Sequence, residues 1–408
     1  MHGMFRWIFF IALAFSSSLL LYGAECAEPL KFSSSTQFLW GDDELGNSQN
    51  IFAQYLRLTY NPEGGKIGMS GYGRVIYDLN STPFYEDTAG AVGRLYYLYL
   101  DYTPVQNVSM RLGRQFIAFT ADQAIMDGLR VDVHNLGPIG ITLAGGMDVQ
   151  QTLQSSFSEL GNYFWGIDVH LERVKSLQLG ISFSQTFDQW DRARELFGGN
   201  FRYVHKFFSP YAQAQFSYLT NSFDEVTAGV DIFPLSNLLV KFEYYQAYPT
   251  FDSTSIYSVF AVEQYKEYLV EAEYSFEAPV VAYASYVKQQ YQDGDNADRW
   301  TLGTKVFPLK NLNVNLAVDY RHGYGGNLWG FEITSGYKII EKLILDAGVQ
   351  YDVYERPDQF GNQFARRYWI GGDWLISKNM SAIGRIEDNV NETFEHRTLG
   401  RVAFNWAF

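Results

Sequence analysis

Apolar and polar residues alternate one by one along this chain, and no other feature constrains its fold as strongly. In residues 177–184 the odd positions are Leu, Leu, Ile and Phe, and the even positions are Gln, Gly, Ser and Ser. Residues 313–320 and 343–352 repeat the pattern. Since the side chains of a β-strand point to opposite faces in turn, each segment predicts a strand with one apolar face. Soluble antiparallel sheets share this pattern, but segments of about 10 residues in such number suit tilted strands that cross a bilayer.

Residues 1–26 form a predicted secretory signal peptide. A basic start precedes an almost unbroken apolar run over Trp7–Tyr22, and small residues follow it. We expect cleavage near Cys26, which leaves residues 27–408 as the mature chain. Lipidation of Cys26 is the alternative, but the Glu25 before it fits a lipobox poorly.

The composition of the remaining chain favours a membrane protein without helical spans. After the signal peptide, no apolar run reaches the roughly 18–20 residues that a transmembrane helix needs. Aromatic residues nevertheless make up 17% of the sequence, and outer-membrane barrels carry girdles of aromatic residues. No linker or change in composition divides the chain. We therefore predict an all-β fold in which residues 27–408 form a single antiparallel transmembrane β-barrel.

Short turns recur along the chain and allow the strands to be counted. We expect ten such turns, at 61–65, 103–106, 135–138, 173–176, 208–210, 234–237, 277–279, 308–311, 339–342 and 376–379. Longer polar segments lie between them, so the pattern predicts short periplasmic turns and long extracellular loops. With a closing seam between the first and last strands, it predicts about 22 strands, an even number between about 18 and 24.

The last residues of the chain predict how it reaches the membrane. RVAFNWAF places Val402, Phe404, Trp406 and Phe408 on one face of a final strand. An alternating last strand that ends in Phe resembles the C-terminal β-signal that the barrel-insertion machinery of Gram-negative bacteria reads. The alternative is an ordinary terminal strand of a soluble sandwich. With the signal peptide, this segment favours the outer membrane, where lipid and lipopolysaccharide are the expected partners.

The alternation also predicts which charged side chains face the barrel interior, because the face that meets lipid must be apolar. A barrel of about 22 strands is too wide for side chains to fill, so its interior is expected to hold water. We hypothesise a basic wall at the seam opposite a more acidic wall, which would orient polar solutes; simple wetting of the wall is the alternative. The predicted lumen-lining residues are Arg57, Arg74, Arg111, Arg367, Arg385, Arg401, Asp148, Asp168 and Asp231.

The sequence carries no pattern typical of catalysis, of a cofactor or of a metal site. His134, His170 and His205 stand near the turns of alternate strands, about 10 Å apart by strand spacing, and are predicted to be rim residues rather than metal ligands. Its close glycines precede no helix, so they form no phosphate loop. A formal net charge of −14 without basic stripes argues against nucleic-acid binding. We therefore predict a protein that is not an enzyme and has no cofactor.

One segment carries a family resemblance. Leu98–Val133, LYLDYTPVQNVSMRLGRQFIAFTADQAIMDGLRVDV, resembles Gram-negative porins and is similar to porins of metal-reducing bacteria. The resemblance implies a channel for small hydrophilic or ionic solutes. It also implies an alternative, the sheath of a porin–cytochrome conduit around a partner multihaem cytochrome. A third alternative is an outer-membrane enzyme or adhesin, for which the sequence shows no site.

Overall fold

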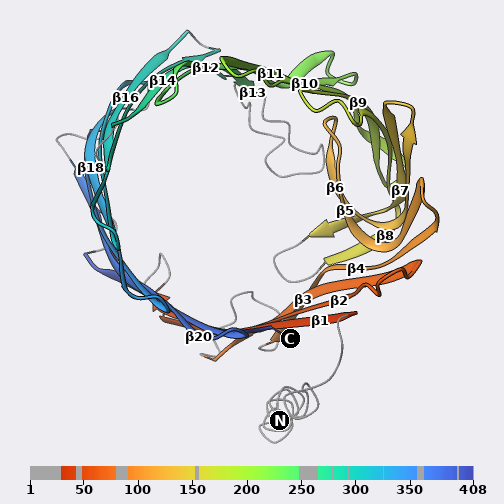
Figure 1. The fold of residues 1–408 in the computed structure, drawn as a ribbon, viewed down its shortest axis with the longest axis horizontal. Coiled ribbons are helices and arrows are strands. Elements are labelled where there is room, and N and C mark those ends of the chain that lie inside the picture. The colour runs from red at the N-terminus through yellow and green to blue at the C-terminus, as the bar shows by residue number, and fades with distance from the viewer. Residues whose placement is uncertain are drawn as a thin grey trace, which may run out of the picture.

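The protein folds into one closed, antiparallel β-barrel (Figure 1). This computed structural model describes residues 29–42, 48–79, 91–151, 156–247, 265–276, 279–292, 294–324, 326–355, 363–392 and 395–407. The predicted signal peptide and Phe408 lie outside these residues. Among the described residues, no helix is long and apolar enough to span a membrane.

The wall of the barrel consists of 22 strands, the number expected from the turns. They are β1 (Leu30–Asp42), β2 (Ser48–Tyr60), β3 (Ile67–Asp78), β4 (Ala91–Val105), β5 (Val108–Ala118), β6 (Gln123–Leu136), β7 (Ile139–Gln151), β8 (Ser156–Leu171), β9 (Leu177–Asp188), β10 (Asp191–Tyr203), β11 (Phe208–Ser217), β12 (Ser222–Leu235), β13 (Leu238–Ala247), β14 (Tyr265–Ser275), β15 (Val280–Tyr291), β16 (Asn296–Leu309), β17 (Leu312–Gly323), β18 (Asn327–Ile340), β19 (Leu343–Glu355), β20 (Gln363–Ser377), β21 (Met380–Val390) and β22 (Arg397–Ala407).

The barrel closes where β1 pairs antiparallel with β22, and we call this junction the seam. Each remaining strand pairs with its neighbour in sequence, so every connection is a hairpin. Closure removes the exposed edges that a flat sheet would leave, which a bilayer does not tolerate. The predicted all-β barrel is therefore confirmed.

One predicted turn is wrong. Residues 208–210 belong to strand β11, and the chain reverses before them, at 204–207. The β10–β11 ladder ends at the pair Arg202 and Tyr211. The missing N–H of Pro210 therefore falls beyond that ladder, and the proline is tolerated within the strand.

The outer half of hairpin β5–β6 leaves the wall and folds into the interior, where Figure 1 shows it inside the ring. Pairing of β4 with β5 ends at Leu98 and Arg114, although both strands continue beyond this point. Residues 118–123 at the hairpin tip lie against β8, β9 and β10. We call residues 114–127 the inner hairpin.

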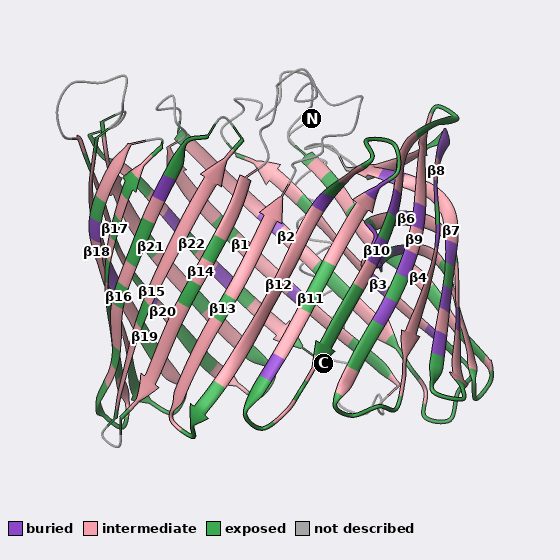
Figure 2. Cartoon of the chain, turned by 90° about the horizontal axis from the view of Figure 1, so that it is seen from above, coloured by how far each residue is buried: buried purple, intermediate pink, exposed green. Residues whose placement is uncertain are grey.

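The neighbouring hairpin compensates for this departure. Strand β8 pairs with β9 only as far as Tyr163, and its upper end contacts β4 and β6 instead. The wall is therefore two layers thick here, with the inner hairpin on the inside. A hydrophobic core of Ile117, Phe119, Met126, Ala144 and Phe164 fills the space between the layers. Figure 2 shows buried positions gathered on β6–β10.

Candidate functional site: a charged lumen with an inserted hairpin

The contacts of the inner hairpin identify the inner face of the wall. The Ala121 N–H donates to Ser182 Oγ at 2.7 Å, and Gly198 lies directly against Ala121. Ser182 and Gly198 are register partners, so both point inward. The pairing register carries this assignment around the ring, because directly paired residues share a face. The opposite face presents large exposed apolar residues, such as Leu302 and Ile370, as lipid contact requires.

The register places every charged residue of the sequence-based prediction on the inner face. These residues are Arg57, Arg74, Arg111, Arg367, Arg385, Arg401, Asp148, Asp168 and Asp231. On the last strand, Val402, Phe404 and Trp406 take the outer face, opposite to Arg401. Contact of solutes with the inner residues and recognition of the last strand by the insertion machinery stay predictions.

Arginines dominate the inner face on both sides of the seam, and we call this region the basic arc. Its members are Arg57, Arg74, Arg111, Arg367, Arg385 and Arg401. Three of them share two acids: Glu387 binds Arg367 at 2.9 Å and Arg385 at 3.1 Å, and Asp101 binds Arg111 at 2.8 Å. The others have no ion-pair partner among the described residues.

Carboxylates outnumber cations on the inner face of β12–β19, which we call the acidic arc. The acids are Glu225, Asp231, Glu243, Glu267, Glu271, Glu273, Asp319, Glu332, Asp346 and Asp352, and the cations are Lys241, Arg299, Lys305, Arg321 and Lys338. Strand β14, near the centre of this arc, lies half-way around the 22-stranded ring from β3 in the basic arc. The two arcs therefore face each other across the lumen.

The acidic wall is displaced from where the sequence analysis put it. Asp148 and Asp168, chosen as its members, lie on β7 and β8 beside the inner hairpin, and only Asp231 belongs to the acidic arc. The glutamates of β14 were missed, although Glu267, Glu271 and Glu273 stand on the polar side of an alternating segment. Their period-2 spacing would have identified them.

The inner hairpin is anchored by matched contacts with the wall. Asp122 Oδ1 pairs with Arg194 Nη1 at 2.9 Å, and the Asp122 side chain is only 3% exposed. Phe119 packs against Gly166, where a Cβ would approach its ring to 2.8 Å. At Gly198 a Cβ would stand 2.2 Å from the backbone nitrogen of Ala121. Glycines at these positions thus form the seat of the hairpin.

A polar joint fixes the base of the inner hairpin between the two layers. Arg114 donates from Nε and Nη2 to the two carboxylate oxygens of Asp127, at 2.8 and 2.7 Å. Asp127 also accepts from Ser158 Oγ on β8 at 3.0 Å. A 3.4 Å contact joins Arg114 to the carbonyl of Leu95, above the point where β4 loses β5 as a partner. The joint therefore supplies polar partners where the ladder is interrupted.

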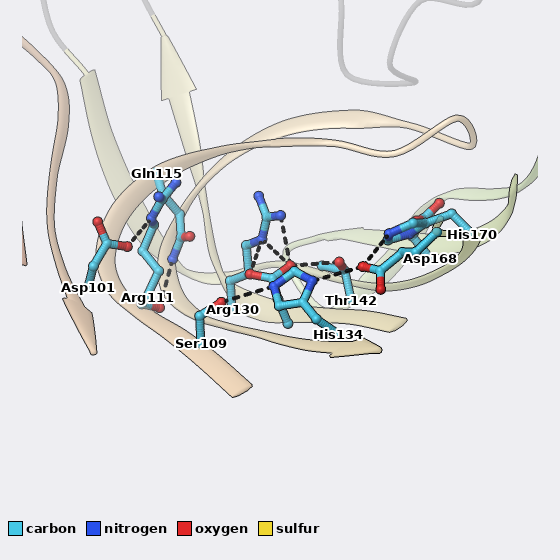
Figure 3. A network of polar contacts seen from close by, with 11 residues as sticks. Asp101, Ser109, Arg111, Gln115, Arg130, His134, Thr142, Asp168 and His170 are labelled. Atoms are coloured by element: carbon cyan, nitrogen blue, oxygen red, sulfur yellow. Dashed lines mark hydrogen bonds and ion pairs between the residues drawn. The ribbon is translucent and has the colours of Figure 1, made fainter. Parts of the chain in front are cut away.

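Below the hairpin, a polar network follows the inner face of β4–β8 toward the short turns (Figure 3). In its middle, Arg130 binds both oxygens of Asp132, which also accepts from Thr142 at 2.7 Å. At the rim, Glu172 Oε1 lies 2.9 Å from His134 Nδ1 and 3.6 Å from His170 Nε2.

Two of the rim histidines, His134 and His170, are linked because both contact Glu172. His170 also binds Asp168 through Nδ1 at 2.7 Å. Within the part of the chain that the structure describes, no group of three potential ligands is placed to hold a metal ion. The sequence prediction of rim residues rather than ligands remains a prediction.

Hydrogen bonds to Glu172 hold the pKa of its carboxyl below the ordinary value. The largest contribution is the backbone N–H of Asn135, which donates to Oε2 at 2.7 Å, followed by His134. Asn135 has a φ of 61°, the left-handed conformation that tight turns require and asparagine tolerates. Glu172 thus joins the end of β6 to the turn after β8.

Comparison with known proteins supports the fold. The barrel is similar to the siderophore receptor PirA from Pseudomonas aeruginosa, with a TM-score of 0.62 at 10% identity, covering 94% of this chain and 81% of that chain. Acinetobacter baumannii OccAB4 (TM-score 0.46, 10% identity, 93% and 97% covered) and a BenF-like porin from Pseudomonas fluorescens Pf-5 (TM-score 0.46, 8% identity, 93% and 98% covered) are less similar in shape. The sequence matches no known protein family and no curated protein. The likeness to PirA shows the fold alone, a closed β-barrel.

Proposed function

We propose that this protein is a porin of the Gram-negative outer membrane, which lets small hydrophilic or ionic solutes pass through a water-filled lumen. The observation that carries the proposal is the charged inner face of a closed barrel of 22 strands. A barrel of this width leaves an aqueous channel unless something fills it. Among the described residues, the inner hairpin covers the wall near β7–β10 and leaves the basic and acidic arcs uncovered.

The two arcs suggest how solutes are handled in transit. A charged solute entering a lumen with cations on one wall and carboxylates on the other experiences a transverse field. An ion is drawn toward the wall of opposite sign, and a dipolar solute is oriented across the lumen. In this proposal the protein acts by passage and selection alone, without catalysis and without a cofactor.

The cellular context belongs to the same proposal. A signal peptide over residues 1–26 would export the chain, and the insertion machinery would recognise Val402, Phe404, Trp406 and Phe408. The apolar outer face would then contact lipid, and the loops would meet lipopolysaccharide. Strands of 10–16 residues suit a bilayer crossed at a tilt.

A conductance measurement tests the proposal. We expect protein purified from outer membranes and added to a planar lipid bilayer to produce discrete, long-lived current steps in KCl. A boiled sample serves as the control. A correctly folded barrel that produces no current would contradict the proposal, because a closed lumen cannot pass solutes.

The alternative of a sheath around a multihaem cytochrome receives no specific support. The inner hairpin occupies part of the cross-section of the barrel (Figure 1). An enzyme or adhesin likewise has no observation in its favour among the described residues.

A further inference from the structure

The inner wall is hollowed at the seam, near its short-turn end. A pocket of about 600 Å³ lies on the inner side of β1, β2, β3, β21 and β22. Its lining offers the hydroxyl and amide groups of Ser33, Ser35, Ser381 and Asn405. This volume lies within the range of sites that hold small molecules.

Two arginines of the pocket lack an anionic partner. Neither Arg57 nor Arg401 forms an ion pair or a hydrogen bond among the described residues, and Arg57 lies over the Tyr72 ring at 4.9 Å. The neighbouring acid Glu387 is bound to Arg367 and Arg385 instead. Because a guanidinium presents a planar fork of donors, these arginines can each receive a carboxylate in bidentate geometry.

Stacked tyrosines line the same pocket, and Arg57 lies against one of them. Tyr55 and Tyr72 both line the pocket, and their rings stack with centroids 6.3 Å apart. Tyr96 extends the stack beyond Tyr72 at 4.8 Å. The pocket therefore combines ring faces, neutral hydrogen-bonding groups and unpaired cations.

We propose that the seam pocket binds sugar acids, meaning ring-shaped solutes that carry several hydroxyl groups and one carboxylate. The carboxylate contacts Arg57 or Arg401, the hydroxyl groups contact the serines and Asn405, and the C–H face of the ring packs on Tyr55 and Tyr72. The proposal rests on the porin function, since the pocket opens into the lumen. The seam is then a binding site on the solute path rather than only a hydrated surface.

Current interruption by D-glucuronate tests the pocket. The wild-type channel in a planar bilayer should show concentration-dependent, saturable interruptions of the KCl current. Glucose, which lacks the carboxylate, should bind at least about tenfold more weakly, the effect of losing one hydrogen bond between charged groups. Since either arginine can receive the carboxylate, Arg57→Gln and Arg401→Gln should each weaken the apparent affinity for glucuronate in part, and the double variant should weaken it by the full factor.

Lys305→Gln is the matched control, because Lys305 is an inner-face cation of the acidic arc. It should leave the affinity for glucuronate unchanged. Equal weakening by Lys305→Gln, or equal affinity for sulfate, would overturn the proposal, since either result indicates a general anion effect.

Different results would refute the proposed pocket and the proposed porin function. A conducting channel that glucuronate does not interrupt, and that shows no calorimetric heat of binding in detergent, would refute the pocket alone. Absence of any current would refute the porin function, and calorimetry would then still test the pocket. Circular dichroism confirms that each variant is folded before either measurement.

Discussion

Glu172 is the side chain that joins the end of β6 to the turn after β8 at the rim of the barrel. Its carboxylate accepts the Asn135 N–H and lies 2.9 Å from His134 Nδ1, while His170 approaches the same oxygen. The Glu172 side chain is 17% exposed, so its hydrogen bonds are partly shielded from water. Such bonds to a charged group contribute more than neutral ones.

Replacing this carboxylate should cost stability in a pH-dependent way. Glu172→Gln removes the charge but keeps the shape, and we expect it to lower the free energy of unfolding by about 1 kcal/mol near neutral pH. Since the native pKa of Glu172 is lowered, its contribution is present above the ordinary value of about 4.3 and is lost as pH falls through the native pKa. Urea unfolding in lipid vesicles, followed by tryptophan fluorescence, measures the difference at about pH 7 and about pH 3.

Glu341→Gln is the control for that measurement. Glu341 occupies the turn between β18 and β19, is exposed and makes no hydrogen bond or ion pair among the described residues. We expect it to leave stability unchanged at both pH values. A loss in Glu172→Gln that persists undiminished at acid pH would show that the carboxylate charge is not its source.

The rim residues show which properties of a single position can be predicted from the sequence. His134 and His170 could be placed at the short-turn end from the sequence, because each stands close to a turn signal. Their connection through Glu172 could not, since it depends on the register between β6, β7 and β8. A shift of register by one residue would turn these side chains to the other face.

At the scale of elements, the inner hairpin departs most from a simple barrel. The strands β5 and β6 alternate well enough to be predicted, yet their tip was expected to be an outer loop. Its inward position depends on contacts between residues far apart in sequence, such as Ala121 with Ser182 and Gly198. The local signal in the sequence is the pair of apolar residues Ile117 and Phe119 near the tip, which are buried here and which an exposed outer loop would not require.

A larger side chain at Gly198 should displace the inner hairpin. Gly198→Val places a side chain where even a Cβ atom would stand 2.2 Å from the Ala121 backbone nitrogen. Overpacking of this kind costs about 1–3 kcal/mol, and the inner hairpin relieves it by moving away from β10. We expect altered single-channel conductance together with reduced stability to urea.

Gly199→Val provides a neighbouring control. Gly199 points to the other face, and the atom nearest to its added Cβ is the Gly180 carbonyl oxygen at 3.9 Å. This variant should conduct like the wild type. Identical conductance in Gly198→Val and Gly199→Val would mean that the inner hairpin does not border the ion path.

At the scale of the molecule, the number of strands and the closed ring followed from alternation and turns, because both are local properties. The distribution of charge around the ring followed only in part. The basic arc could be predicted because the first and last strands meet at the seam, which brings Arg57 and Arg401 to neighbouring parts of the wall. The acidic arc depends on which strands lie half-way around, and this requires the exact strand assignment.

The opposed arcs predict that the position of a charge matters as well as its sign. Replacing Arg367, Arg385 and Arg401 with glutamine removes positive charge from the basic arc, whereas replacing Arg299, Lys305 and Arg321 removes the same charge from the acidic arc. We expect the first variant to shift the reversal potential strongly toward cation selectivity, because the anion path loses its attractive wall. The second should shift it less, since anions already avoid that wall. The comparison belongs in a KCl gradient at low salt, because at about 0.1 M the field is screened over about 10 Å.

Equal shifts of the reversal potential in both variants would show that ion selectivity follows net charge alone. Unchanged selectivity in the first variant would refute the hypothesis of a transverse field.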